Sequence, residues 1–370
     1  MRSHVLPTSG TAVSRRPTSR DVARIAGVSR TTVSLVLNGK RLGSIPLATR
    51  QRVLDAARTL GYVPDAAGRS LVSGRTGTLA LVVGHARHLA VDGFLPQVLT
   101  ALNETAHTAG YHVLVDAVDD PRRPDAYFAR VRAGRVDGLV VVNPRSDDAA
   151  LEALLESGFP VAVIGNVPGF EGACSACHDL HGGRLVAEHL LRLGRRRIAY
   201  LGFAPPTFRA SAERLEGLRA TLDASGVELS EARLRHAAFS AQSGYRETAA
   251  WLRDGVRFGA LFAGNDTVAF GALAALREHG LQVPADVAVI GFDDLPLARF
   301  ALPRLSSVRS HPAEHGRRAA RALIAGIEGR PAPAEPPLPP RLIVRRSCGA
   351  VHRPADRPAT DRPATGKETP

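Results

Sequence analysis

From Thr78 onward, short uninterrupted apolar runs alternate with stretches that repeat apolar residues at helical spacing. Strands that are apolar on both faces are typical of parallel sheets covered by helices on both sides. We therefore expect an α/β region of two doubly wound parallel-sheet subdomains, in which ligands bind beyond the carboxyl ends of the strands. The apolar runs lie at residues 79–83, 113–115, 139–142, 161–164, 198–201, 261–263 and 287–290, and the helix-like stretches at 95–109, 151–157, 183–193 and 267–279.

A second pattern, the segment TSRDVARIAGVSRTTVSLVL at residues 18–37, predicts two short helices joined by a tight turn. Thr18 is suited to cap the first helix, and Asp21 favours the positive end of the helix dipole. Gly27 can adopt the backbone conformation that a turn requires, and Ser29 can cap the second helix. Together these features predict a helix-turn-helix. The apolar positions expected to bury it are Val22, Ala23, Ile25, Ala26, Val33, Val36 and Leu37.

The second of these helices is expected to enter the major groove of DNA, with its N-terminal residues facing base edges. Arg30, Thr31 and Ser34 fall on its exposed side. An arginine can pair with two acceptors of a guanine, while Thr and Ser can contact bases or phosphates. The alternative is an ordinary helical hairpin with solvated polar faces, which does not account for the spacing of small residues together with the local charge.

The charge of the chain is concentrated at its N-terminal end. The whole sequence carries a net charge of +13, whereas residues 1–75 carry 13 Lys and Arg against 3 Asp and Glu, a net charge of +10. Residues 76–344 carry 29 of each sign. A basic module on a neutral body is typical of a protein with a polyanionic partner such as double-stranded DNA. The alternative is a basic arm that has no nucleic-acid partner. Charge alone does not decide between the two, so the DNA-binding interpretation depends on the helix-turn-helix motif.

The cysteines suggest a cofactor site only superficially. Cys174, Cys177 and His178 match the C-x-x-C-H pattern of haem attachment, and His181 could complete a metal site. Haem attachment needs an export route, and the N-terminal residues show no signal for export. A structural zinc site needs a second pair of ligands, and no second Cys pair follows at a suitable spacing. We therefore expect no metal and no cofactor.

At this point the sequence resembles the LacI/GalR family of transcriptional regulators over about residues 18–347. The most specific matches are DVARIAGVSRTTVSLVLNG at 21–39, TRQRVLDAARTLGYVPDAAGRSL at 49–71 and SGRTGTLALVV at 73–83. The resemblance implies a ligand-controlled regulator, by default a repressor. It implies a homodimer on a pseudo-palindromic operator, with an effector domain like periplasmic sugar-binding proteins.

These patterns together predict the division of the chain. We expect a disordered arm at 1–17, an all-α helix-turn-helix DNA-binding domain at 18–61 with its third helix from Pro46 to Leu60, a hinge or linker at 62–77, a ligand-binding and dimerisation domain at 78–347, and a disordered tail at 348–370.

The resemblance also implies which residues touch DNA. Leu71 holds the position of a leucine that wedges into the minor groove, an insertion that kinks DNA. Leu35 stands where the family usually has Arg, so base preference there should differ. Asp65 and Gly68 replace a common Asn and Ala, and Gly68 should weaken helix formation in the hinge. The full predicted set is Thr18, Ser29, Arg30, Thr31, Thr32, Ser34, Leu35, Asn38, Arg69 and Leu71.

The effector site is carried over from the family in the same way. Asn166 follows one apolar run, and Phe239 is expected opposite Phe94 across the cleft. Leu95 and Gly165 replace an aromatic residue and an Asp that many relatives carry, so the ligand need not be a common sugar. Planar donors and carboxylates between aromatic faces suit a hydroxyl-rich ligand, such as a carbohydrate. The predicted contacts are Phe94, Asn166, Arg214, Phe239, Asn265 and Asp293.

Simpler structural roles remain open for several residues in this region. Phe94 and Phe239 could belong to the core, Asp266 could cap a helix, and Asp294 could satisfy a turn.

Two other functions fit an α/β region in principle. An enzyme is possible on fold alone, but no G-x-G-x-x-G follows the first strand, and neither G-x-x-x-x-G-K-[ST] nor G-x-S-x-G occurs. A transport solute-binding protein would need an export signal, and residues 1–19 hold no continuous apolar segment. With no run of about 18 apolar residues, we expect no membrane association and a cytoplasmic location.

Overall fold

The computed structural model describes residues 17–37, 44–63 and 74–350, except 119, 121, 122, 124 and 176. The chain divides into two compact units, Met1–Thr76 and Gly77–Pro370. Three predicted DNA contacts, Asn38, Arg69 and Leu71, and the hinge positions Asp65 and Gly68 lie outside the described residues. No helix among the described residues is long and apolar enough to cross a membrane.

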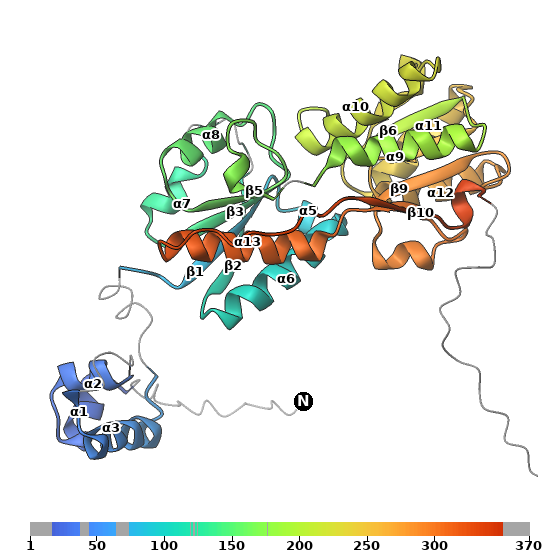
Figure 1. Ribbon diagram of the computed structural model, residues 1–370. Helices are drawn as coiled ribbons and strands as arrows, with labels where there is room; N and C mark the ends of the chain where they lie inside the picture. Colours follow the sequence, from blue (N-terminus) through green and yellow to red (C-terminus); the bar gives the residue numbers. More distant parts are fainter. Residues whose placement is uncertain are drawn as a thin grey trace, which may run out of the picture. The chain divides into compact units, whose positions relative to one another are not determined.

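The described residues of the first unit form a three-helix bundle (Figure 1). Its helices are α1 (Ser19–Ala26), α2 (Arg30–Leu37) and α3 (Leu47–Leu60). Contrary to the sequence-based expectation, Ile25 does not belong to the core: 49% of its surface remains exposed. The core that holds the bundle together contains Val22, Ala23, Ala26, Val33, Val36, Ile45, Val53, Ala56 and Ala57.

The second unit contains two parallel sheets, and the first forms its N-terminal subdomain. The strand order is β2-β1-β3-β4-β5, with every neighbouring pair parallel. The strands are β1 (Thr78–Val83), β2 (His112–Ala117), β3 (Gly138–Val142), β4 (Val161–Ile164) and β5 (Cys174–Ser175). The helices and turns between them are α5 (His88–Val91), α6 (Phe94–Thr108), α7 (Phe128–Arg132), α8 (Ala149–Glu156) and η2 (Glu171–Ala173).

The second sheet forms the C-terminal subdomain in the order β11-β10-β9-β8-β6-β7. Its strands are β6 (Ile198–Gly202), β7 (Leu234–His236), β8 (Ala260–Ala263), β9 (Ala288–Asp293), β10 (Ser306–Arg309) and β11 (Arg341–Ile343). Its α-helices are α9 (Asp179–Arg192), α10 (Arg209–Ala224), α11 (Ala241–Arg253) and α12 (Asp266–Glu278). Three short turns, η3 (Glu231–Arg233), η4 (Pro296–Arg299) and η5 (Arg346–Cys348), complete this subdomain.

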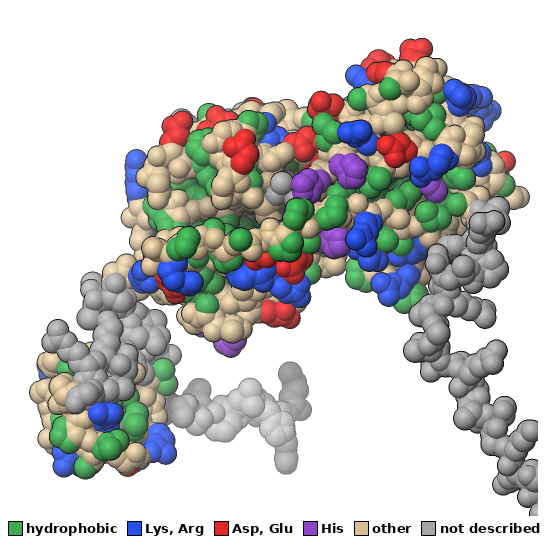
Figure 2. Space-filling model, in the orientation of Figure 1, with side chains coloured by type: hydrophobic (Ala, Val, Ile, Leu, Met, Phe, Trp, Pro, Cys, Tyr) green, Lys and Arg blue, Asp and Glu red, His purple; other side chains and the backbone are tan. Residues whose placement is uncertain are grey.

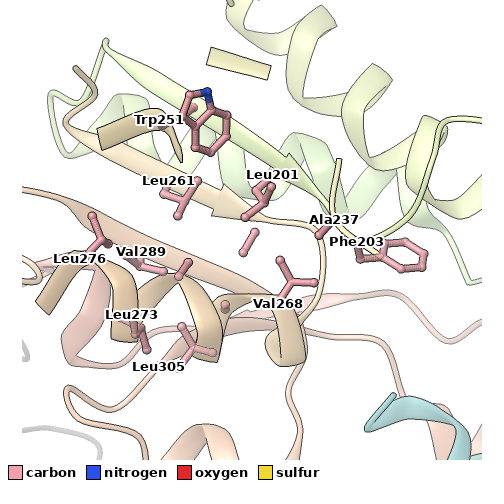
Figure 3. Packing of buried hydrophobic residues seen from close by; sticks show 14 of the residues in the cluster. Leu201, Phe203, Ala237, Trp251, Leu261, Val268, Leu273, Leu276, Val289 and Leu305 are labelled. Carbon is pink, nitrogen blue, oxygen red and sulfur yellow. The ribbon is translucent and has the colours of Figure 1, made fainter. Parts of the chain in front are cut away.

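Helices cover both faces of both sheets, because successive strand residues point to opposite sides. In the first sheet, Leu79 and Leu81 face α6 and α13 (Pro312–Ile327), whereas Ala80 and Val82 belong to the cluster that contains α8. In the second sheet the two faces are covered by α11 with α12 and by α9 with α10. Figure 3 shows the core covered by α11 and α12, in which the strand residues Leu201 and Leu261 lie between Trp251 and the α12 residues Val268 and Leu273. The doubly wound prediction is confirmed.

The chain crosses between the subdomains three times. It leaves the first sheet after β5, returns from β10 to α13, and crosses back to β11. Helix α13 packs on the first sheet through residues such as Ala320 and Leu323, although its sequence follows the second sheet. The N-terminal subdomain therefore contains a helix whose sequence follows β10, and the links between the two subdomains lie close together in space (Figure 1).

Two features differ from the sequence-based expectation. Strand β11 pairs antiparallel with β10, so the second sheet is not wholly parallel. Cys348, assigned to the disordered tail, is fully buried, and the Nε2 atom of His189 lies 3.3 Å from its Sγ atom. The folded unit extends beyond residue 347 because η5 packs into the core beside β9 and β10.

Close packing of helices predicts an asymmetric effect of two glycine substitutions. A Cβ atom at Gly217 in α10 would lie 1.9 Å from the backbone oxygen of Leu180, whereas one at Gly326 in α13 would meet nothing within 4 Å. We expect Gly217→Ala to cost about 1–3 kcal/mol because the backbones of α9 and α10 must separate. Gly326→Ala should be neutral or stabilising by up to about 1 kcal/mol. Thermal unfolding of the two variants tests this, and equal melting temperatures would contradict it.

Candidate functional site

The helix-turn-helix is shaped by hydrogen bonds at its helix ends. Thr18 caps α1 by accepting a hydrogen bond from the N–H of Asp21 at 3.4 Å, and its own N–H donates to Asp21 Oδ2 at 2.9 Å. Gly27 ends α1 with φ of 65°, in the left-handed region. Ser29 Oγ accepts from the N–H of Thr32 at 3.1 Å. The predicted capping roles of Thr18 and Ser29 are confirmed, so their hydroxyls are engaged locally.

The exposed face of α2 carries the remaining polar residues. Arg30, Thr31 and Ser34 are exposed, as expected from the sequence. Thr32 is half-buried, and its hydroxyl lies 2.9 Å from that of Ser29. Leu35 is also half-buried and packs against the bundle core. The unit shows basic side chains on the visible part of its surface (Figure 2), which suits a face for phosphates and base edges.

The second unit has its polar cleft where the carboxyl ends of the two sheets meet. The order of both sheets reverses at a point beside the first strand, and ligands bind at such switch points. The residues that line the cavity there therefore follow strands: Asn143 after β3, Gly165 after β4, Phe203 after β6, Asn265 after β8 and Asp293 at the end of β9. The same cavity is lined by Asp92, Phe94, Cys177, Asp179, Ala210 and Arg214.

Arg214 is the central cation of this cleft. Its Nε atom donates to Asp179 Oδ1 at 2.7 Å, its Nη1 atom donates to the carbonyl of Gly264, and its Nη2 atom lies 3.8 Å from Asp293 Oδ1. The guanidinium carbon lies 3.7 Å from the centre of the Phe292 ring. A buried guanidinium needs such compensation because it has left water.

The carboxylates around Arg214 are buried as well. Burial raises the pKa of Asp293 to about 6, against the attraction of Arg214 and a 2.9 Å hydrogen bond from Ser310 Oγ. Burial also raises the pKa of Asp92 to about 7, although its Oδ1 atom accepts a 2.9 Å hydrogen bond from the N–H of Phe94. Perturbed carboxylates in a cleft indicate a binding site.

The two subdomains of the second unit are also joined by an aromatic contact. The ring of His88 on α5 stacks on that of Phe239, with 3.9 Å between their centres. The N–H of Gly93 donates to Thr267 Oγ1 at 3.3 Å across the same boundary. The cavity that remains measures about 10 Å³, the room of a single water molecule. A ligand of sugar size therefore requires the subdomains to move apart.

The structure brings four of the six predicted effector contacts together. Phe94, Arg214, Asn265 and Asp293 line the cavity, and Asn265 also caps α12 through the N–H of Val268 at 2.8 Å.

The other two lie elsewhere. Asn166 is exposed, and its Nδ2 atom donates to Glu213 at 3.4 Å. Phe239 lies three residues beyond β7, packs against Phe203 and Phe208, and stacks on His88 of the N-terminal subdomain without lining the cavity.

Several cavity residues escaped the sequence analysis. Asn143 could have been found, because it directly follows an apolar run and so stands at a carboxyl end. Asp92 precedes a helix and Asp179 begins one, and neither belongs to a periodic pattern.

The structure also decides the role of Asp266, which does not cap a helix. It accepts hydrogen bonds from the N–H of Leu295 at 2.7 Å and from Ser307 Oγ at 2.6 Å. Among the described residues, no group of three or more His, Cys, Asp or Glu is placed to hold a metal ion.

Two arginines on α10 provide a test of the central ion pair. Arg214→Leu should lower stability by about 3–5 kcal/mol, because it leaves the carboxylates of Asp179 and Asp293 buried without a cation. Arg219→Leu removes an exposed pair with Glu231 and should cost no more than about 1 kcal/mol. Scanning calorimetry of both variants measures the difference, and a similar loss in the two would refute the role given to Arg214.

Comparison with known proteins gives a consistent family. Residues 18–65 match "Bacterial regulatory proteins, lacI family", and residues 187–348 match "Periplasmic binding protein-like domain". The chain is 33% identical over 338 residues to the HTH-type transcriptional regulator CelR of Thermobifida fusca, covering 90% of this chain and 98% of the relative. It is 32% identical over 343 residues to the HTH-type transcriptional regulator DegA of Bacillus subtilis (strain 168), covering 91% and 99%.

Solved structures agree with this assignment. A lac repressor dimer bound to operator and the anti-inducer ONPF matches with a TM-score of 0.78 and 27% identity, over 91% of this chain and 100% of that one. A CelR–cellobiose complex matches with a TM-score of 0.67 and 32% identity, over 90% and 100%. These relatives are transcriptional regulators rather than enzymes. The chain belongs to the LacI family of bacterial transcriptional regulators.

Proposed function

We propose that this protein is a transcriptional repressor that binds a pseudo-palindromic operator as a homodimer and responds to a small, hydroxyl-bearing effector. The observation that carries the proposal is the capped helix α2, which presents Arg30, Thr31 and Ser34 to solvent from a rigid three-helix core. A rigid helix with exposed polar residues at its start suits insertion into the major groove. Because its partner is chromosomal DNA, the protein acts in the cytoplasm.

The effector acts through the cleft between the subdomains of the second unit. Phe94, Arg214, Asn265 and Asp293 are the predicted contacts that line it, joined by Asp92 and Asn143. A ligand shifts the protein between states only if it binds one of them more tightly. The closed cleft, with its cavity of about 10 Å³, is one such state. A related regulator has been solved with cellobiose, which supports a carbohydrate as the class of effector.

The test of DNA reading uses two arginines of equal charge. Purified protein is incubated with fragmented genomic DNA from its source bacterium, with and without candidate sugars, and the retained DNA is sequenced. We expect enrichment of a short inverted repeat. Arg30→Ala should weaken binding to that repeat by about 1–3 kcal/mol, roughly 5- to 150-fold, through loss of a base contact.

Arg58→Ala is the matched control. Arg58 is exposed on α3 and paired with Asp55, so its loss should leave sequence preference unchanged. If the two variants weaken binding equally, α2 does not read bases. If no repeat is enriched under any condition, the proposed repressor function fails.

The homodimer is expected to use an exposed apolar segment of the second unit. Leu297, Phe300 and Leu302 lie between β9 and β10 with 64%, 74% and 84% of their surfaces exposed. Large apolar side chains gathered in one exposed segment are typical of an interaction surface.

Single charges in this segment test the dimer. Phe300→Asp should convert the dimer to monomer in sedimentation equilibrium, because a carboxylate would have to be buried in the interface. Leu47→Asp, a change of an equally exposed leucine in the first unit, should leave the dimer intact. A Phe300→Asp variant that remains dimeric would exclude this surface.

A further inference from the structure

The cleft of the second unit holds more negative than positive groups. Three carboxylates, those of Asp92, Asp179 and Asp293, line its cavity, and all are almost fully buried. Among the described residues that line it, Arg214 is the only Arg or Lys. A buried charge without a partner is unfavourable. Which of the three carboxylates Arg214 pairs with therefore determines the charge that a ligand in the cleft must carry.

Arg214 is already committed to one side of the cleft. Its closest carboxylate is that of Asp179 at 2.7 Å, and Asp293 lies farther away at 3.8 Å. Both aromatic neighbours of the guanidinium, Phe203 and Phe292, belong to the C-terminal subdomain and fix its plane there. The guanidinium therefore compensates Asp179 fully and Asp293 in part.

Asp92 stands on the other side, in the N-terminal subdomain between α5 and α6. It is 5% exposed, and its carboxylate accepts a hydrogen bond from the N–H of Phe94. Among the described residues, no Lys, Arg or His forms an ion pair with Asp92. Asp92 nevertheless lines the same cavity as Asp293 and Arg214. A carboxylate in this position lacks a counter-ion that a ligand could supply.

The groups facing Asp92 keep this imbalance at neutral pH. On its own segment, burial lowers the pKa of His88 to about 4, so that ring is uncharged. From β9, Asp293 adds negative charge, while Arg214 on α10 offsets it only partly. Asp179 on α9 is paired with Arg214, and burial raises the pKa of Asp266 on α12 well above its usual range.

We propose that the effector carries a positively charged nitrogen, a protonated amine on a hydroxyl-bearing molecule such as an amino sugar, and that Asp92 binds this nitrogen. The inference rests on the proposed role of the cleft as the effector site. An ammonium group supplies both the missing charge and hydrogen-bond donors for the carboxylate. The surplus of carboxylates disfavours phosphorylated or acidic ligands by repulsion.

A proton and the amine compete for Asp92, which gives the proposal a pH signature. In the free protein the carboxyl has a pKa of about 7 because of burial. Between pH 6 and pH 7 its ionised fraction rises from about one tenth to about one half, so the affinity for an amine should rise about fivefold.

The first experiment measures thermal shifts and affinities of the full-length protein with matched ligands. Glucosamine, galactosamine and mannosamine are each compared with the N-acetyl derivative and the parent hexose, and 1-amino-1-deoxyglucitol is compared with glucitol. The proteins are the wild type, Asp92→Asn and Asp223→Asn. Asp223 lies exposed on α10, so its variant matches the change in charge away from the cleft.

We expect at least one amine to bind the wild type and Asp223→Asn, at least tenfold more tightly than its neutral partners. The same amine should lose at least tenfold in affinity with Asp92→Asn. An amine that binds the wild type and Asp92→Asn equally well would overturn the charge assignment, while leaving a ligand-controlled repressor intact. Failure of every amine in the panel would also overturn it.

A ligand-free measurement provides a second, independent test. A carboxyl whose pKa is raised in the folded state stabilises the protein below its unfolded pKa, and that contribution is lost as pH rises through the folded value. The melting temperature of the wild type should therefore fall relative to that of Asp92→Asn between pH 5 and pH 8. Parallel curves would show that Asp92 holds no unpaired charge and would overturn the proposal. The DNA-retention assay reports the proposed function separately.

Discussion

The common direction of the strands is the constraint on which the site depends. In each subdomain every pair formed by β1 to β10 within its sheet is parallel, so all those strands end at the same edge. Strand interiors must be apolar because helices cover both faces, whereas the residue after each strand is released from that requirement. Polar groups such as Asn143, Asn265 and Asp293 therefore gather at the edges. Because the edges of the two sheets face each other, one cleft collects them all.

Within the cleft, fixed and movable groups come from different subdomains. Arg214, Asp179 and Asp293 belong to the C-terminal subdomain, so their ion pairs persist when the subdomains separate. Asp92 and Phe94 belong to the N-terminal subdomain and would regain water on opening. The stack of His88 on Phe239 would break in the same movement. The free protein thus already gains contacts by closing, and an effector must add to or replace them to change the equilibrium.

Much of the fold is readable from the sequence because most strands of the two sheets contain an uninterrupted apolar run. The seven predicted runs coincide with β1, β2, β3, β4, β6, β8 and β9. The missed strands are short or polar: β5 has two residues, and β10 reads Ser-Ser-Val-Arg. Such segments are strands only because a neighbouring strand supplies hydrogen bonds, which no local pattern reveals. For the same reason Cys348 appeared to belong to a tail, although β9 and η5 bury it.

Site residues were predictable where they follow a strand with a clear apolar run. They were not predictable where tertiary packing determines which side chains reach the cleft. Asn265 and Asp293 follow apolar runs, and Arg214 was carried over by resemblance. Phe239 lies outside the cavity, at a position set by a turn with a φ of 60° three residues beyond a short polar strand. No pattern in the sequence marks Asp92 as a site residue. Its importance arises from burial beside other carboxylates, and burial is a property of the folded chain.

Under this proposal the two units would bind ligands of opposite charge. The basic region of residues 1–75, with its net charge of +10, attracts the phosphates of DNA over a distance of about one Debye length. With three carboxylates around one guanidinium, the cleft would repel phosphates at contact. Nucleotides and sugar phosphates, which are abundant anions, would be held off the effector site without any steric barrier. Occupancy of the cleft would therefore report the concentration of a cationic metabolite, even in the presence of many polyhydroxylated anions.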